Sequence, residues 1–140
     1  MFVLHEQLQK DTILVGHFPL CCLLLMQDAH YPWFILVPQR NCVSEIYQLS
    51  ADDQQQLSRE SVYLAKVLME TYAGDKMNIA ALGNVVPQLH IHHIVRYQHD
   101  VAWPSPVWGK VQAKPYTTKE LAARLHKLKE KLLMDFCFSR

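Results

Sequence analysis

The sequence predicts an α+β domain built on an antiparallel sheet. Three apolar stretches at residues 12–18, 20–26 and 33–37 are separated by short connections, as in an antiparallel meander. Residues 51–73 then show apolar or small residues at helical spacing. Two more apolar stretches follow at 76–82 and 85–97. The order predicts a five-stranded antiparallel sheet with a long helix after the third strand and a C-terminal helix.

Length and composition fit one compact domain over residues 1–140. Half of the residues are apolar and 19% are charged, which is ordinary for a globular protein and too apolar for disorder. The net charge of +1 gives no reason to expect a nucleic-acid or membrane partner. No apolar run approaches the roughly 20 residues of a membrane helix. The N-terminus does not resemble a signal peptide, and the four cysteines form no C-x-x-C pair, so a cytoplasmic protein with reduced thiols is expected.

Helix-capping residues mark both predicted helices. Ser50 fits an N-cap before two acidic residues, and Gly74 fits the C-cap of the long helix. Thr117 and Glu120 form a capping box, and leucines recur at helical spacing after it, which predicts a C-terminal helix over about 117–135. Basic residues on this helix fit a solvated face, with a nucleic-acid-binding arm as the alternative.

The stretch from Gln88 to Ile94 places polar groups on one face of the fifth strand. Successive side chains of a strand point to opposite faces, so Gln88, His90 and His92 share a face and His93 lies on the other. Two imidazoles and an amide on one face are poorly suited to a core and well suited to a site. The alternative is the polar edge of a half-exposed strand.

Two chemistries fit this face. A neutral histidine can attack phosphorus and split one displacement into two easier ones, while the second imidazole holds a proton or donates to a phosphate oxygen. A zinc site would also use histidines two residues apart, but it needs three or four protein ligands. No spacing singles out the missing ligands, so we expect neither a metal site nor a cofactor.

The motif and its surroundings resemble the histidine triad (HIT) superfamily of nucleotide hydrolases and transferases. The family motif, His-φ-His-φ-His-φ-φ with φ apolar, aligns with Gln88, His90 and His92 in place of its three histidines. The strand and helix order resembles the family over about residues 11–109. Trp103-Pro104 resembles the tryptophan–proline loop of its nucleoside phosphoramidase branch, and the combined string 84–94 plus 102–109 resembles a bacterial branch of small single-domain HIT proteins.

The resemblance implies a role for each matching residue. His90 falls at the nucleophile that becomes nucleotidylated, and His92 at the histidine that supports the transition state. Gln88 completes the catalytic set. The substrate-binding candidates are Asp28 for the ribose, Asn78 and Arg96 for phosphate, His99 as a leaving-group acid, and Trp103 in the loop; Leu14, Phe18, Leu25 and Leu36 are candidates for an apolar base pocket.

The implied activity is that of a nucleotide phosphoramidase or hydrolase. It would act on the α-phosphate of a nucleoside phosphoramidate or nucleoside phosphate, through a covalent nucleotidyl-histidine. Family members are usually homodimers, so a homodimer is expected. Gln88 replaces the first histidine and cannot take a proton near pH 7, so the alternative is a catalytically slow nucleotide-binding module. A zinc-binding protein is a third reading.

Overall fold

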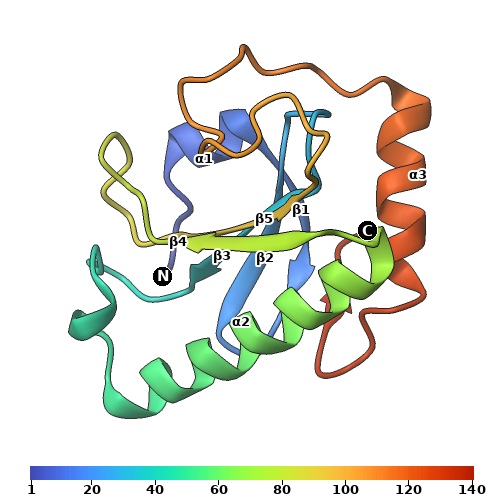
Figure 1. The fold of residues 1–140 in the computed structure, drawn as a ribbon. Helices are drawn as coiled ribbons and strands as arrows, with labels where there is room; N and C mark the ends of the chain where they lie inside the picture. Colours follow the sequence, from blue (N-terminus) through green and yellow to red (C-terminus); the bar gives the residue numbers. More distant parts are fainter.

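A six-stranded antiparallel sheet organises the computed structural model, which describes residues 1–140. In space the strands follow the order β4-β5-β3-β2-β1-β6, so β5 is flanked by β4 and β3 (Figure 1). The bounds are β1 (Thr12–His17), β2 (Cys21–Met26), β3 (Trp33–Pro38), β4 (Lys76–Ala80), β5 (Ile91–Arg96) and β6 (Cys137–Phe138). The predicted α+β class and all five predicted strands are confirmed.

The sixth strand is the one that the sequence did not predict. β6 has two residues, which pair with Gly16 and His17 of β1. A strand of two residues shows no alternation, so its sequence carries no recognisable signal.

The long helix packs across one face of the sheet. Besides α2 (Ala51–Tyr72) the chain forms α1 (Glu6–Asp11), α3 (Thr118–Lys129) and a 3₁₀ turn, η1 (Ile46–Gln48). Ser50 caps α2 as predicted, because its Oγ accepts from the Asp53 N–H at 3.1 Å. The predicted C-cap was wrong by one residue: Ala73, with φ 48°, takes the left-handed conformation. Gly74 serves another need, because a Cβ there would collide with the Val95 side chain of β5.

The C-terminal helix is shorter than predicted. It begins as expected, with Thr117 Oγ1 accepting from the Glu120 N–H at 3.1 Å, but it ends at Lys129 and not near 135. The Leu128 carbonyl accepts the N–H groups of Lys131 and Leu132, so the chain turns there. Leu128 and Leu132 are both buried in the core although the chain turns between them. Because both are apolar and four residues apart, the leucine spacing predicted a longer helix.

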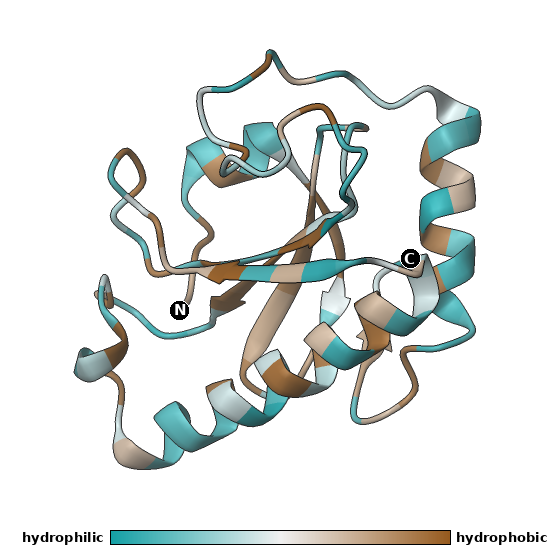
Figure 2. Cartoon of the chain, in the orientation of Figure 1, coloured by the Kyte–Doolittle hydropathy of each residue, from teal (hydrophilic) through white to brown (hydrophobic).

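Apolar side chains fill both faces of the sheet. The first core lies between the sheet and α2 and includes Leu64, Leu68, Phe34 and Ile91. The second core lies on the opposite face and includes Trp33, Ile35, Ile94 and Val107. In Figure 2 the strands are mostly brown, while α2 and α3 also carry teal, hydrophilic residues. No helix is long and apolar enough to span a membrane.

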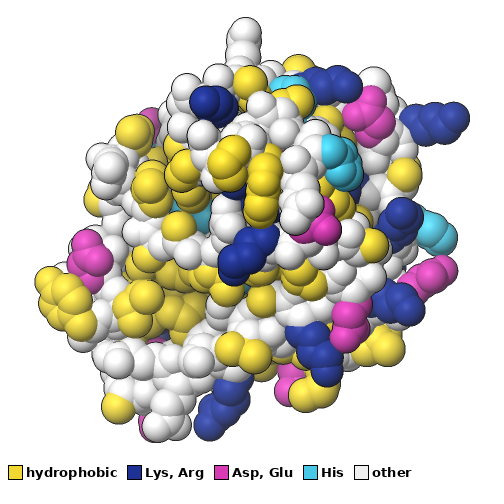
Figure 3. Space-filling model, in the orientation of Figure 1, with side chains coloured by type: hydrophobic (Ala, Val, Ile, Leu, Met, Phe, Trp, Pro, Cys, Tyr) yellow, Lys and Arg dark blue, Asp and Glu magenta, His cyan; other side chains and the backbone are white.

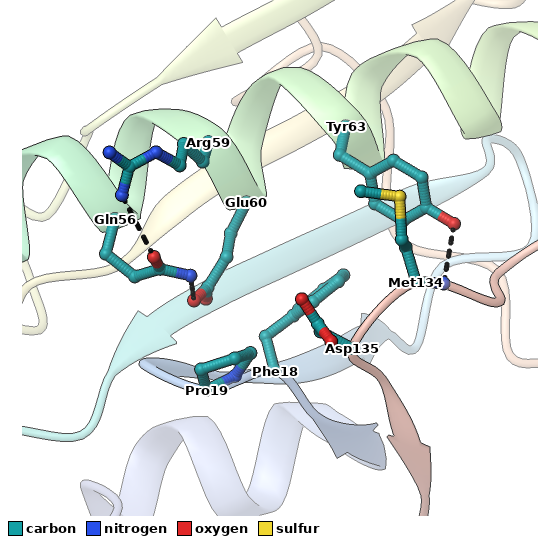
Figure 4. A pocket seen from close by; sticks show the side chains of 8 residues that line it. All are labelled: Phe18, Pro19, Gln56, Arg59, Glu60, Tyr63, Met134 and Asp135. Carbon is teal, nitrogen blue, oxygen red and sulfur yellow. Dashed lines mark hydrogen bonds between the residues drawn. The ribbon is translucent and has the colours of Figure 1, made fainter.

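A buried carboxylate joins α2 to the turn between β1 and β2. Glu60 accepts the backbone N–H groups of Leu20 and Cys21, both at 2.9 Å, and the Gln56 side-chain amide at 2.7 Å. Burial, followed by the Glu60 charge, raises the pKa of the Cys21 thiol. A cavity of about 130 Å³ lies beside this turn, with Glu60 and Phe18 in its wall (Figure 4). Phe18 belongs to the first core, so the cavity lies on the face away from His90 and His92.

Candidate active site

The strand that carries the histidines begins later than predicted. β5 starts at Ile91 and not at residue 85, because its neighbours stop there: β3 pairs only as far as Leu36 with Ile91, and β4 only as far as Ala80 with His92. Before the strand, Pro87 has no N–H, and the Leu89 N–H donates to the Val43 carbonyl at 2.9 Å. The predicted alternation still holds, since Leu89 and Ile91 enter the first core while the two histidines face the other way.

A hydrogen bond at Nδ1 holds the His90 imidazole, and its Nε2 has no hydrogen-bond partner. Its Nδ1 lies 2.7 Å from the Gln88 carbonyl oxygen, which can only accept, so Nδ1 carries the proton and donates. In the neutral ring Nε2 therefore keeps its lone pair. The loop before the strand lies close against the imidazole: a Cβ on Gly83 would stand 3.1 Å from His90 Cε1. The side chain is oriented as a nucleophile needs to be.

His92 is held at both nitrogens. Trp33 donates its indole N–H to His92 Nδ1 at 3.0 Å, so the proton of the neutral ring lies on Nε2, which donates to the Leu82 carbonyl at 3.1 Å. Burial, followed by the nearby His90, lowers the pKa of His92 to about 4. The ring centroids of His90 and His92 are 4.9 Å apart, and Trp108 lies 5.0 Å from His92. At neutral pH His92 is thus a neutral hydrogen-bond donor.

The Gln88 side chain binds the start of the chain and makes no hydrogen bond with His90 or His92. Its Oε1 accepts from the His5 N–H at 2.8 Å, and its Nε2 donates to the Val3 carbonyl at 2.9 Å. Its contribution to His90 comes through its backbone carbonyl. The polar face predicted from alternation is therefore occupied by two imidazoles.

His93 lies on the opposite face, as predicted. Its Nδ1 donates to the Ile91 carbonyl at 3.1 Å, which leaves Nε2 to accept from the Ser61 hydroxyl of α2 at 2.7 Å. Burial lowers the pKa of His93 to about 4. The structure thus gives His93 a packing role between the sheet and α2.

Three of the predicted phosphate- and loop-binding residues meet one another. Arg96 donates to both carboxylate oxygens of Asp100, at 2.9 and 3.1 Å, and to the Asn78 side-chain oxygen and the Ser105 carbonyl, both at 2.8 Å. Its guanidinium also lies 5.7 Å from the Trp103 ring centroid. Arg96 is 1% exposed, so these contacts hold the turn after β5 and occupy most of its donors.

The other two substrate-binding candidates, Asp28 and His99, make no hydrogen bond with His90 or His92. Asp28 follows β2, and its Oδ1 accepts from the backbone and ring of His30 and from the Lys114 N–H, while Oδ2 has no partner. His99 lies in the turn past Arg96, the last residue of β5, and the strand rises about 20 Å from His90 to Arg96. It is exposed and packs on Tyr97, whose hydroxyl bonds the α2 carbonyl of Tyr72. Within one chain the structure does not bring His99 to His90.

The base-pocket expectation was wrong for Phe18, Leu25 and Leu36. All three are buried in the first core, on the α2 side of the sheet. Leu14 is 45% exposed on β1. The apolar surface next to the histidines comes instead from the second core and its neighbour Trp108.

Sequence reasoning missed Trp33 and the Leu82 carbonyl, the two partners of His92. The available signal for Trp33 was its alternation with Ile35, which places it on the same face of β3, next to the strand that carries His92. Leu82 carried no signal, because any residue supplies a carbonyl. No group of three or more His, Cys, Asp or Glu side chains is arranged to bind a metal.

The sheet presents an oriented histidine beside a second, neutral one at the start of β5, next to the edge strand β4, and comparison with known proteins assigns the family. A HIT domain model matches residues 7–99. The structure resembles a histidine triad protein of Marinobacter aquaeolei VT8, with 52% identity, a TM-score of 0.93, and coverage of 96% of this chain and 98% of the other. It also resembles histidine triad proteins of Bradyrhizobium japonicum (44% identity, TM-score 0.91, 93% and 97% covered) and Sinorhizobium meliloti (40%, 0.91, 94% and 97%). No curated protein sequence matches the chain.

The chain therefore belongs to the histidine triad family, in a bacterial group. This membership gives it a nucleotide-binding function of the HIT type. The family consists in general of hydrolases and transferases.

Proposed function

We propose that the protein is a nucleotide phosphoramidase or hydrolase that works through a covalent nucleotidyl-His90. The substrate is a nucleoside phosphoramidate or nucleoside phosphate, attacked at its α-phosphorus. The observation that carries the proposal is the 2.7 Å hydrogen bond from His90 Nδ1 to the Gln88 carbonyl, because it leaves the Nε2 lone pair free. The family membership supports the same reaction class.

The first displacement forms a bond between His90 Nε2 and phosphorus. The bond from phosphorus to the leaving amine or alkoxide breaks, and the leaving group takes up a proton from solvent water. The nucleotidylated ring retains its Nδ1 proton and carries a positive charge, which the Gln88 carbonyl stabilises through the hydrogen bond it already makes. In the second displacement water attacks phosphorus and gives up a proton to solvent, the bond from phosphorus to His90 Nε2 breaks, and the nucleoside monophosphate and neutral His90 are released.

His92 acts as a donor in this reaction. Its pKa of about 4 keeps it neutral at pH 7, and Trp33 keeps its proton on Nε2. That N–H can exchange the Leu82 carbonyl for a non-bridging phosphate oxygen, whose negative charge makes it the stronger acceptor. His92 thus stabilises the transition state without transferring its proton.

The substrate-binding roles of Asp28, Asn78, Arg96, His99 and Trp103 remain predictions. Support is strongest for Asp28, because its free Oδ2 can accept a ribose hydroxyl. It is weakest for Arg96, whose donors already serve Asp100, Asn78 and Ser105.

The test is a search for the covalent intermediate. The protein is incubated with adenosine 5′-phosphoramidate and its intact mass is measured after a rapid quench. We expect an acid-labile adenylate on the wild type and none on His90→Ala. His126→Ala, which removes an exposed histidine of α3, should be labelled like the wild type. Product release without any adduct on a trapping time scale would contradict the covalent route.

A slow nucleotide-binding module is the second candidate. It is favoured by the absence of a leaving-group acid: Gln88 is bonded to Val3 and His5, and His99 lies past the far end of β5. This candidate predicts that adenosine monophosphate binds while the wild type gives neither adduct nor product. The arrangement of side chains gives no support to the hypothesis of a zinc-binding protein.

A further inference from the structure

Gln88 connects two parts of the chain that are far apart in sequence. Its side-chain amide accepts from the His5 N–H and donates to the Val3 carbonyl, which are the two groups that a neighbouring antiparallel strand would engage. Its backbone carbonyl accepts from His90 Nδ1. One residue therefore holds both the nucleophile and the first residues of the chain.

These first residues lie on the same face of the sheet as the histidines. We call residues 1–5 the N-terminal segment. Phe2 and Leu4 are half-buried against the second core, and so is Trp108, which contacts His92. Figure 1 shows the segment running beside the loop that leads into β5. The segment is thus placed to form a wall next to His90.

We propose that Gln88 is a positioning residue that fastens the N-terminal segment as one wall of the nucleotide site. The inference rests on the proposed function, and it gives the glutamine a task of its own in place of a lost histidine. An amide presents its donor and acceptor side by side, which matches the Val3 carbonyl and the His5 N–H. The two nitrogens of an imidazole point in diverging directions and cannot make both bonds.

Removing the Gln88 side chain should weaken substrate binding more than it slows the chemical step. The backbone of Gln88 is held in place by contacts that do not involve its side chain. Pro87 precedes it, and the Leu89 N–H that follows donates to the Val43 carbonyl. The carbonyl that orients His90 should therefore stay in place in Gln88→Ala. We expect KM to rise about tenfold with kcat changed less than twofold, as two hydrogen bonds that hold the wall are lost. Gln88→His, which restores the family residue, should show the same loss and no gain.

His5 offers a matched pair of variants. Its φ of −54° suits proline, so His5→Pro removes the N–H that Gln88 accepts without straining the backbone. His5→Ala keeps that N–H and loses only the ring that accepts from the Gln7 N–H. We expect His5→Pro to weaken binding about as much as Gln88→Ala, His5→Ala to weaken it less than His5→Pro because the N–H is kept, and the double variant His5→Pro/Gln88→Ala to be no worse than either parent.

Two readouts separate this inference from the proposed function. The dissociation constant of adenosine monophosphate measures how well the site binds a nucleotide and requires no turnover. The rate of hydrogen exchange at the His5 amide measures whether its hydrogen bond to Gln88 is intact. A tenfold weaker nucleotide affinity in Gln88→Ala, Gln88→His and His5→Pro, with faster exchange of the His5 amide in the two Gln88 variants, supports the inference, even if the wild type forms no adduct. Unchanged affinity in His5→Pro, or a kcat/KM for Gln88→His above the wild type, overturns it.

Discussion

His92 and His93 are adjacent in sequence, and both are neutral although they face opposite sides of the sheet. The bonds from Trp33 and to Leu82 fix the first ring, and the bonds from Ser61 and to Ile91 fix the second. In each case burial is the main cause that lowers the pKa to about 4. Each ring therefore contributes to folding only as long as it is neutral.

We expect the protein to lose stability as the pH falls from about 6.5 to about 4. Above pH 6.5 the histidines of the unfolded chain are neutral too, so the full stability is present. Below it the unfolded chain binds protons that His92 and His93 in the folded chain cannot bind until about pH 4. At 1.36 kcal/mol per unit of pKa shift, each ring accounts for about 3 kcal/mol.

Urea unfolding at a series of pH values measures this loss. His93→Leu should flatten the slope of the unfolding free energy against pH, while His126→Ala, at an exposed position of α3, should not. A slope that is the same in His93→Leu and the wild type would mean that His93 titrates normally in the folded protein.

At the scale of elements, the turn after β5 is built around the buried pair Arg96 and Asp100. Burial alone would raise the pKa of Asp100, but hydrogen bonds from Arg96 and from the Tyr97 and Ala102 N–H groups hold it below its ordinary value. Arg96 also reaches Asn78 on β4 and Ser105 in the loop. The pair therefore ties the loop that carries Trp108 to the sheet.

Arg96→Met should lower the free energy of unfolding by about 3–5 kcal/mol, because it leaves the Asp100 carboxylate buried without its partner. The double variant Arg96→Met/Asp100→Asn should recover part of that loss. Chemical denaturation measures both. If Arg96→Met folded with near wild-type stability but no longer bound adenosine monophosphate, the phosphate-binding role suggested by the sequence would be the better account.

The same elements show what the sequence could predict. Alternation placed His90 and His92 on one face and His93 on the other, because the period of a strand is a local property. The start of β5, the partner of Arg96 and the destination of the Gln88 side chain were not predictable. The first and third depend on residues far along the chain, since the hydrogen bonds that join Gln88 to Val3 and His5 span 85 and 83 positions. Arg96 pairs with Asp100 only four residues on, but that pairing depends on the shape of the turn between them, which shows no periodic pattern.

For the whole molecule, the open edge of the sheet at β4 bears on assembly. β4 pairs only with β5, so its outer backbone groups are free. Ile79 on this strand is 51% exposed, and next to it lies a hollow of about 190 Å³ whose wall includes Ile46 and Leu57. Figure 3 shows apolar side chains gathered on this side of the molecule. These features support the expected homodimer, joined along β4.

We expect Ile79→Lys to shift the protein toward the monomer, because the charge would be buried at a β4 contact. Leu133→Lys is the matched control, since Leu133 is 75% exposed on the C-terminal segment. Sedimentation equilibrium over a range of concentrations measures the change. A wild type that is monomeric at every concentration, or an Ile79→Lys variant as dimeric as Leu133→Lys, would contradict a β4 interface.

The hydrogen bond between Trp33 and His92 gives the protein an optical property. The chain has three tryptophans, and the indoles of Trp33 and Trp108 lie 5.7 and 5.0 Å from the His92 ring. Indole emission depends on its surroundings, and two of the three fluorophores stand beside the candidate phosphate position. The intrinsic fluorescence of the unlabelled protein therefore reports mainly on the site, and the titrations described above need no added dye.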